Sequence, residues 1–481
     1  MTPLATIVAL FLYFAVLMLA SRLTASQSND SFFLGNRQSR WWVVAIGMVG
    51  ASVSGISVVS VPGMVGGSGF SYMQTVLGFF FGYVAIACLL LPLYYRLNLT
   101  TIYGYLNERF GKTTHKTGSW FFILAKMVSA ATKLYVVVLV LQRFALDEWH
   151  VPFGVTTIIC VTLIWLYTHR GGIKTIVWTD MLQTLFMVAA IVFMLIEMYA
   201  LLGNGFKAAT TEVMQSDYSN WFVWSDWHSP RHFIKQFVSG IFIVIVMTGL
   251  DQDMMQKNLS CRNLKEARRN LLSYGIAFVP VNLLLLFLGA LMLLYANQQG
   301  IHLPERPDEM VPMFATTLFG KGAALCFLLG IVAASFSSAD SALTAITTTF
   351  DVDILNIKRF NAKQGENVRK MTHLAVCLIF VGVVQVFYLI GNKSIIDLIY
   401  TIVGYAYGPL LGLFACGLLT RMRIRERFVP FVAVAAPVLT FITQYVTLQT
   451  FGYSFGYELL ILNALFTIAG LALIREKQTI L

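Results

Sequence analysis

The sequence predicts an all-α protein that crosses a membrane many times. Of its 481 residues, 57% are hydrophobic and only 12% are charged, and the mean hydropathy is +0.72. Soluble domains carry about 25% charged residues, so this composition indicates an integral membrane protein. A membrane-spanning helix needs about 20 apolar residues. By that measure thirteen helices are expected, near residues 3–21, 41–66, 70–95, 119–142, 151–167, 176–202, 234–250, 272–296, 321–349, 371–390, 395–419, 429–448 and 454–474.

Basic residues fix the direction of these helices. The segments between the predicted spans that face one side of the membrane hold 25 of the 34 Lys and Arg residues. Among them are the basic loops 257–269 and 421–427. Because loops rich in Lys and Arg stay in the cytoplasm, the N-terminus is expected outside and the C-terminus inside. We therefore expect a multi-pass protein of the plasma membrane, a bacterial inner membrane, with the lipid bilayer as its partner. The basic loops serve this topology, contact with anionic lipids is secondary, and no nucleic-acid partner is expected.

No motif for an enzyme or an ATP-driven pump occurs. The six cysteines are scattered, which leaves no disulfide framework and no paired-cysteine metal site. The seven histidines form no metal-ligand pair, and no glycine-rich nucleotide loop or nucleophile elbow is present. The chain is therefore not expected to be an enzyme.

Residues 331–353 are the most informative stretch for function. An apolar helix there carries a dense set of hydroxyl groups around one carboxylate, Asp340. Hydroxyl, carbonyl and carboxylate oxygens are the ligands of alkali cations, and an acidic residue inside a membrane is costly and indicates function. The alternative is that the small side chains only allow close helix packing.

Two predicted spans are interrupted as a simple membrane anchor is not. The span 41–66 ends in a run from Val61 to Gly69, where Pro62 lacks an amide donor and the glycines favour non-helical backbone. The span 234–250 ends in Thr248-Gly-Leu-Asp-Gln-Asp253. Carbonyl groups freed at such breaks can face only a protein-lined or water-lined cavity, where they can coordinate an ion.

The two interrupted spans lie five spans apart, so each is expected to open one of two inverted five-helix repeats. The predicted units are an additional N-terminal helix and loop (1–40), the first repeat (41–202), an external connector (203–233), the second repeat (234–419) and two accessory helices (420–481).

Four separate segments match one known pattern. They are Tyr167-Thr-His-Arg-Gly-Gly-Ile-Lys-Thr-Ile-Val-Trp-Thr-Asp-Met-Leu-Gln183, Tyr103-Gly-Tyr-Leu-Asn-Glu-Arg-Phe-Gly111, Leu250-Asp-Gln-Asp-Met-Met-Gln256 and the hydroxyl-rich helix that ends at Asp353. Together they resemble the sodium–solute symporter family in its own order over nearly the whole chain. The resemblance implies a LeuT-type fold of five-plus-five inverted repeats, and sodium as the coupling ion.

The resemblance also implies two cation sites. The family's main sodium site matches the backbone carbonyls of Val53, Ile56 and Ala334 and the hydroxyls of Ser337 and Ser338.

A second site of some members matches Asp180, Asp340 and Ser341. Asp340 stands where a hydroxyl would be expected, so the two carboxylates could share a proton instead of a sodium ion. Asp180 could otherwise be a helix N-terminal carboxylate favoured by the helix dipole.

The positions implied for the solute depart from the sugar-transporting members. Met247 and Thr248 replace an aromatic pair, and Thr401 replaces a glutamine. Ser57 and Ser60, on the first core helix, are further candidates for contacting the solute. The resemblance therefore does not support a hexose pocket of the glucose-transporter kind.

Two lysines lie within the apolar span 119–142. A lysine in the middle of a membrane costs about 2.5–3.5 kcal/mol, so it should pair with a carboxylate or meet an anionic solute. We expect Lys133 to contact the solute or to pair with Asp180 or Asp340, and Lys126 to extend toward the cytoplasm.

These observations predict a sodium-coupled symporter, functional as a monomer, that imports a small polar solute by alternating access. A sugar acid or a carboxylate is favoured. The alternatives are a proton-coupled or neutral-sugar symporter of the same fold, or a transporter-like membrane sensor.

Overall fold

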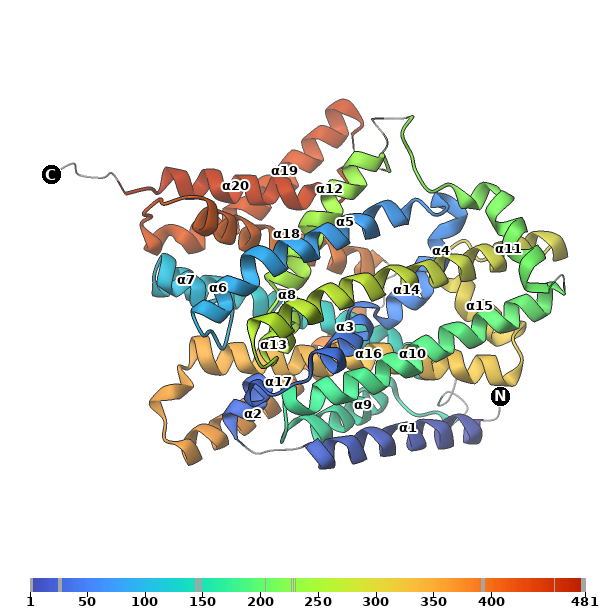
Figure 1. Ribbon diagram of the computed structural model, residues 1–481, viewed down its shortest axis with the longest axis horizontal. Coiled ribbons are helices and arrows are strands. Elements are labelled where there is room, and N and C mark those ends of the chain that lie inside the picture. The colour runs from blue at the N-terminus through green and yellow to red at the C-terminus, as the bar shows by residue number, and fades with distance from the viewer. Residues whose placement is uncertain are drawn as a thin grey trace.

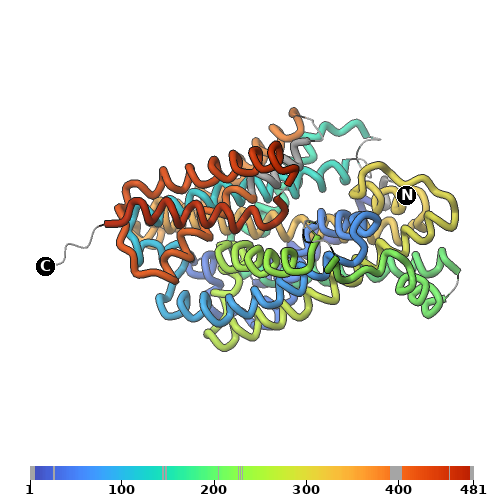
Figure 2. Tube along the Cα trace, turned by 90° about the horizontal axis from the view of Figure 1, so that it is seen from above, coloured from blue at the N-terminus to red at the C-terminus, as the bar shows by residue number. Residues whose placement is uncertain are grey.

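A computed structural model of the chain is helical almost throughout the residues that it describes. These are residues 3–24, 28–142, 146, 149–203, 205–225, 227, 229, 231–390, 394–453 and 455–476, without the side chains of residues 3–5 and 394–403. The helices run mostly along the long axis of the molecule and form one elongated bundle (Figures 1 and 2).

The helices follow in this order: α1 (Pro3–Thr24), α2 (Asn29–Leu34), α3 (Trp41–Ser52), α4 (Gly55–Ser68), α5 (Tyr72–Ala85), α6 (Leu91–Arg96), α7 (Gly104–Arg109), α8 (Lys112–Leu141), α9 (Phe153–Thr168), α10 (Ile173–Leu202), α11 (Gly205–Gln215), α12 (Phe233–Val244), α13 (Gln252–Leu259), α14 (Leu264–Gln299), α15 (Met310–Thr317), α16 (Lys321–Thr349), α17 (Ala362–Ile390), α18 (Ser394–Leu419), α19 (Val429–Phe451) and α20 (Leu459–Leu473).

Each predicted span coincides with one of these helices or with a consecutive pair. By length and composition, eight helical segments of the described chain could each cross a membrane, or nine if the bent pair of α12 and α13 counts as one span. Four further apolar helices are shorter. The total of thirteen therefore stays a prediction. The start of α1 and the end of α20 lie at opposite ends of the bundle, as an odd number of spans requires (Figure 1).

The first interrupted helix breaks at a different place from the predicted one. The helix stops between α3 and α4, at Val53 and Ser54, whereas Pro62 lies inside α4. Gly63, next to Pro62, serves close packing instead of non-helical backbone. A side chain at Gly63 would clash with the Pro307 carbonyl, 2.3 Å away. Only Gly69, which ends α4, has a positive φ among the glycines of this run.

The second interruption lies where the sequence predicts it. The helix α12 continues into a π-helical turn, Ile245–Gly249, and then bends by 66° into α13. Asp251 stands at the break, where its side chain accepts hydrogen bonds from the backbone N–H groups of Asp253 and Met254 and so caps α13. This break places two carboxylates, those of Asp251 and Asp253, in the interior of the bundle.

The helix α16 forms the centre of the molecule. It packs against α10, α8, α3 and α4, and every residue from Gly330 to Thr349 is buried. Its small Ser, Ala and Thr side chains permit these close approaches. Close helix packing therefore accounts for the small side chains of this stretch. It does not account for the buried carboxylate of Asp340.

At the end of α16 the chain is held by a group of polar contacts. Asp353 accepts hydrogen bonds from Thr101 and Ser119, and its carboxylate lies 2.9 Å from Nε2 of His115. These contacts join α16 to α8 and to the loop before α7. The last residue of the sodium-site motif therefore has a structural role in the fold.

Candidate cation site

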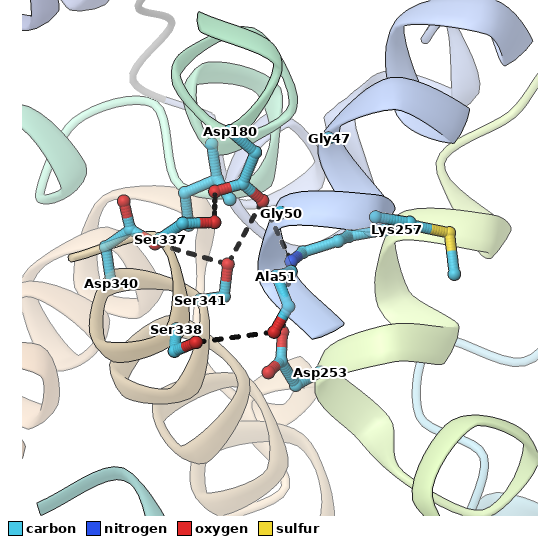
Figure 3. Close-up of polar contacts among 12 residues, drawn as sticks. Gly47, Gly50, Ala51, Asp180, Asp253, Lys257, Ser337, Ser338, Asp340 and Ser341 are labelled. Atoms are coloured by element: carbon cyan, nitrogen blue, oxygen red, sulfur yellow. Dashed lines mark hydrogen bonds and ion pairs between the residues drawn. The ribbon is translucent and has the colours of Figure 1, made fainter. Parts of the chain in front are cut away.

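The polar residues in the middle of α16 face α10 and the break between α3 and α4. Ser337, Ser338, Asp340 and Ser341 are all buried. Figure 3 shows that their side chains gather with Asp180 of α10 and Lys257 of α13. Three helices that are far apart in the sequence thus contribute to one polar cluster.

Asp180 lies at the centre of this cluster. Its Oδ1 accepts a hydrogen bond of 2.6 Å from Ser337, and its Oδ2 accepts one of 3.3 Å from Ser341. The carboxylate is fully buried and belongs to the third turn of α10, which begins at Ile173. The interpretation as a helix N-terminal carboxylate is therefore wrong, because the helix dipole acts within the first turn.

Lys257 is the cation of the cluster, and the sequence did not identify it. Its Nζ lies 2.8 Å from Oδ2 of Asp180 and 3.5 Å from Oδ1 of Asp253, and the side chain is 1% exposed (Figure 3). The prediction that Lys257, as part of the basic loop 257–269, only serves the topology is wrong, since α13 places its side chain in the core. Two signals could have located it: it follows the Asp-Gln motif directly, and Asp253 precedes it by one helical turn.

Asp340 is held without a cation among the described residues. Its Oδ2 accepts a hydrogen bond of 2.7 Å from the hydroxyl of Tyr167, and its Oδ1 accepts one of 3.2 Å from Ser341. Ser341 therefore lies between the two carboxylates and contacts both. The three residues predicted for a second cation site, Asp180, Asp340 and Ser341, are brought together by the fold.

The residues predicted for the main sodium site lie at the break beside this cluster. The hydroxyl of Ser338 is 3.2 Å from the Ala334 carbonyl and 3.3 Å from the Ala51 carbonyl. Ser337 turns toward Asp180 instead. Within the described chain neither hydroxyl bonds to Val53 or Ile56, which stand at and just after the break.

A glycine-lined contact holds α3 against α10 at this level. The Thr184 hydroxyl donates to the Asp180 carbonyl at 2.7 Å and accepts from the Gly50 N–H at 3.2 Å. A Cβ at Gly50 would lie 2.2 Å from that hydroxyl, and one at Gly47 would lie 2.9 Å from Asp180 Cβ. These two glycines therefore let α3 pack directly against α10 beside Asp180.

A second charged group lies at the break between α12 and α13. The Nζ of Lys126 is 3.0 Å from Asp251 and 2.8 Å from Asp253, and Tyr407 donates a 2.8 Å hydrogen bond to Asp251. The expected extension of Lys126 toward the cytoplasm is therefore wrong. Because α8 runs beside the break, this ammonium group finds two carboxylates inside the protein.

Lys133 makes no ion pair with any described residue. The expected alternative, a structural pair with Asp180 or Asp340, is wrong: Lys257 pairs with Asp180, and Asp340 accepts hydrogen bonds from Tyr167 and Ser341. Lys133 follows Lys126 by seven residues, which places both on one face of α8 about 10 Å apart. It lies within electrostatic range of Asp251 and Asp253 but not in contact with them.

The other residues predicted to contact the solute are only partly placed. Ser57 and Ser60 are half-buried on α4, Thr248 is buried in the π-helical turn, and the side chain of Met247 is 47% exposed. Among the described residues, none of them forms a hydrogen bond with Lys133. Thr401 lies in α18, outside the residues whose side chains are described.

The charges of this interior leave one negative charge in excess. When all seven groups are ionised, four carboxylates face three ammonium groups. They are Asp180, Asp251, Asp253, Asp340, Lys126, Lys133 and Lys257. Since a buried net charge is costly, the cluster favours one further cation or a proton on a carboxylate. The donors available, carboxylate, hydroxyl and carbonyl oxygens, are those that suit an alkali ion.

Known proteins resemble this chain over most of its length. The sodium/sialic acid symporter SiaT of Proteus mirabilis is 24% identical over 432 residues, which cover 86% of this chain and 84% of that one. The human sodium/iodide cotransporter is 25% identical over 400 residues, which cover 82% of this chain and 61% of that one. A solved structure of a Na⁺-coupled sialic acid symporter in a substrate-bound outward-open state superimposes with a TM-score of 0.80, at 20% identity, and covers 97% of both chains.

The family model described as "Sodium:solute symporter family" matches residues 32–424. This range includes both helix breaks and the whole polar cluster. The resemblance seen in the four sequence motifs is thereby confirmed. The chain belongs to the sodium:solute symporter family, whose members are sodium-coupled secondary transporters and not enzymes.

Proposed function

We propose that this protein imports a small organic anion, a sugar acid or a carboxylate, together with sodium by alternating access. Its place is the inner membrane of a bacterium, where it works as a monomer with the N-terminus outside and the C-terminus inside.

The observation that carries the proposal is the unpaired Lys133. Lys126 and Lys257 both have carboxylate partners within 3 Å, and Lys133 has none among the described residues. An uncompensated ammonium group within a membrane-spanning helix is costly, so a solute that carries a negative charge relieves it. Sialic acid and iodide, which two relatives of this chain are named for, are both anions.

The cations are assigned to the two predicted sites. The first sodium ion is held by the carbonyls of Val53, Ile56 and Ala334 and by the hydroxyls of Ser337 and Ser338. The nearness of Ser338 to the Ala334 and Ala51 carbonyls supports this assignment. Both hydroxyls now donate hydrogen bonds, so each would turn its lone pairs toward the ion.

The second ion is assigned to Asp180, Asp340 and Ser341. The excess negative charge of the interior supports it. An anionic solute adds one further negative charge, and two sodium ions then make the loaded interior neutral. A proton shared by Asp180 and Asp340 is the competing occupant, and it would leave one sodium ion per solute.

Lys133 divides the anion proposal from the neutral-sugar alternative. We expect Lys133→Gln to abolish binding of the anionic solute and to leave sodium binding unchanged, because Lys133 forms no ion pair with any described residue and contacts neither predicted sodium site. The probes are sialic acid, lactate and glucose, each added to the purified protein in a thermal-shift screen with and without sodium.

Lys133→Arg is the matched control, since it keeps the charge and should keep part of the anion binding. Uptake into liposomes under an imposed sodium gradient or an imposed proton gradient then identifies the coupling ion. A stabilising or transported solute that proves to be neutral would refute the anion proposal. Loss of sodium binding in Lys133→Gln would show that the lysine is structural.

A further inference from the structure

We propose that Lys257 is a tethered cation that occupies the Asp180 site until a sodium ion displaces it. This inference deepens the proposed function and rests on the assignment of Asp180 to a second sodium site. In this arrangement Lys257 is a positioning residue for ion coupling, since it acts through Asp180 and touches no solute.

The ammonium group stands where a sodium ion would bind. Its Nζ is 2.8 Å from Oδ2 of Asp180, and the hydroxyl of Ser341 approaches the same oxygen at 3.3 Å. Ser337 contacts the other oxygen at 2.6 Å. A sodium ion needs these same oxygens, and it would carry the same charge as the ammonium group. The two cations therefore compete for one carboxylate.

A second carboxylate is ready to receive the displaced lysine. Asp253 precedes Lys257 by one turn of α13, and its Oδ1 already lies 3.5 Å from Nζ (Figure 3). Asp253 also binds Lys126, but Lys126 has a further partner in Asp251 at 3.0 Å. When a sodium ion takes its place, Lys257 can thus leave Asp180 while each of these buried charges keeps at least one partner. In an isolated buried ion pair, by contrast, the departing lysine would have no second carboxylate to bind.

The exchange connects sodium occupancy with the broken helix. Lys257 lies on α13, which follows the 66° bend after α12, and Asp180 lies on α10. Without sodium the ion pair ties α13 to α10. With sodium on Asp180 that tie is released, and α13 keeps only its own Asp253. Binding of the ion thereby changes which helices move together, as alternating access requires.

Sodium binding to the full-length protein without solute tests this inference. Thermal stabilisation is followed against sodium concentration, with choline chloride holding the ionic strength constant. Lys257→Met keeps the length of the side chain and removes the competitor, so the half-saturating sodium concentration should fall at least about tenfold. The gain must disappear in Lys257→Met with Asp180→Asn, because the vacated carboxylate is its cause.

A second variant keeps Lys257 in place and decides the question if Lys257→Met does not fold. Asp253→Asn removes the carboxylate that receives the displaced ammonium group, so sodium binding should weaken by about tenfold. Lys126→Met is the matched control: it removes the other cation of Asp253 and should leave sodium binding unchanged or tighter. If the role of Lys257 were purely structural, sodium binding would not tighten in Lys257→Met and would not weaken in Asp253→Asn.

Two results would overturn the inference. One is a folded Lys257→Met variant that binds sodium no more tightly than the parent protein. The other is an Asp253→Asn variant whose sodium binding is unchanged. Both measurements omit the solute, so they can fail while the anion proposal stands, and a neutral solute would leave the tethered-cation inference intact.

Discussion

The ion pair between Lys257 and Asp180 predicts an unequal cost for the loss of its two members. At an effective dielectric constant of about 20, unit charges attract by about 6 kcal/mol at the 2.8 Å separation of this pair and by about 5 kcal/mol at 3.5 Å, the distance from Lys257 to Asp253. Much of this attraction only offsets the loss of hydration. What remains depends on whether the surviving charge has another partner.

Lys257→Met leaves Asp180 with two hydroxyl partners, Ser337 and Ser341, and no cation among the described residues. We therefore expect the full cost of breaking a buried pair, about 3–5 kcal/mol. Asp180→Asn leaves Lys257 beside Asp253, so its cost should be about 1–2 kcal/mol, the range of a lost hydrogen bond to a charged group. In the double variant neither charge remains, and stability should recover above that of Lys257→Met.

The assay is thermal unfolding of the purified variants in sodium-free choline buffer. Lys370→Met is the control, because its pair with Glu366 lies at the surface, with Lys370 40% exposed, and should contribute less than about 1 kcal/mol. Added sodium should raise the melting temperature of Lys257→Met more than that of the parent protein. The reasoning is refuted if Asp180→Asn proves the less stable single variant, or if the double variant melts no higher than Lys257→Met.

Three further variants test the geometry of the site. Ser338→Ala and Ser337→Ala each remove one oxygen that the sodium sites need, which at about 1 kcal/mol should raise the half-saturating sodium concentration of uptake about fivefold; unchanged sodium dependence in both would remove the assignment. Gly50→Ala should destabilise by about 1–3 kcal/mol, since its Cβ would lie 2.2 Å from Thr184 Oγ1 and 3.1 Å from the backbone Cα of that residue. Gly322→Ala, with no atom within 4 Å of the added Cβ, is its control, and equal melting temperatures for the two would contradict the packing argument.

The sequence by itself determined the class of the protein and much of its site. Hydrophobic content and the spacing of apolar runs indicated a helical membrane protein, because the bilayer imposes the length and polarity of every span. The hydroxyl-rich run around Asp340 and the opening at Asp251 are local features, so they were visible in the residues themselves. The four motifs then led to the family.

The tertiary structure decided which charges meet. The sequence placed Lys126 and Lys133 in one apolar span and Lys257 in a basic loop, yet Lys126 and Lys257 pair with carboxylates and Lys133 pairs with none of the described residues. Those partners come from helices distant in the chain, and only the packing of α8, α10 and α13 sets their distances.

The position of the first helix break was also a tertiary decision. Proline suggested a break at Pro62, but neighbouring helices can support a proline within a membrane helix. The carbonyl of Pro62 lies so near α14 that a Cβ on Gly289 would stand 2.3 Å from it. The chain opens at Val53 instead, where the Ala51 carbonyl meets Ser338 of α16. The local preference of proline did not decide the break, because α16 packs against the chain near Val53 and supplies a hydroxyl group, that of Ser338, to a carbonyl there.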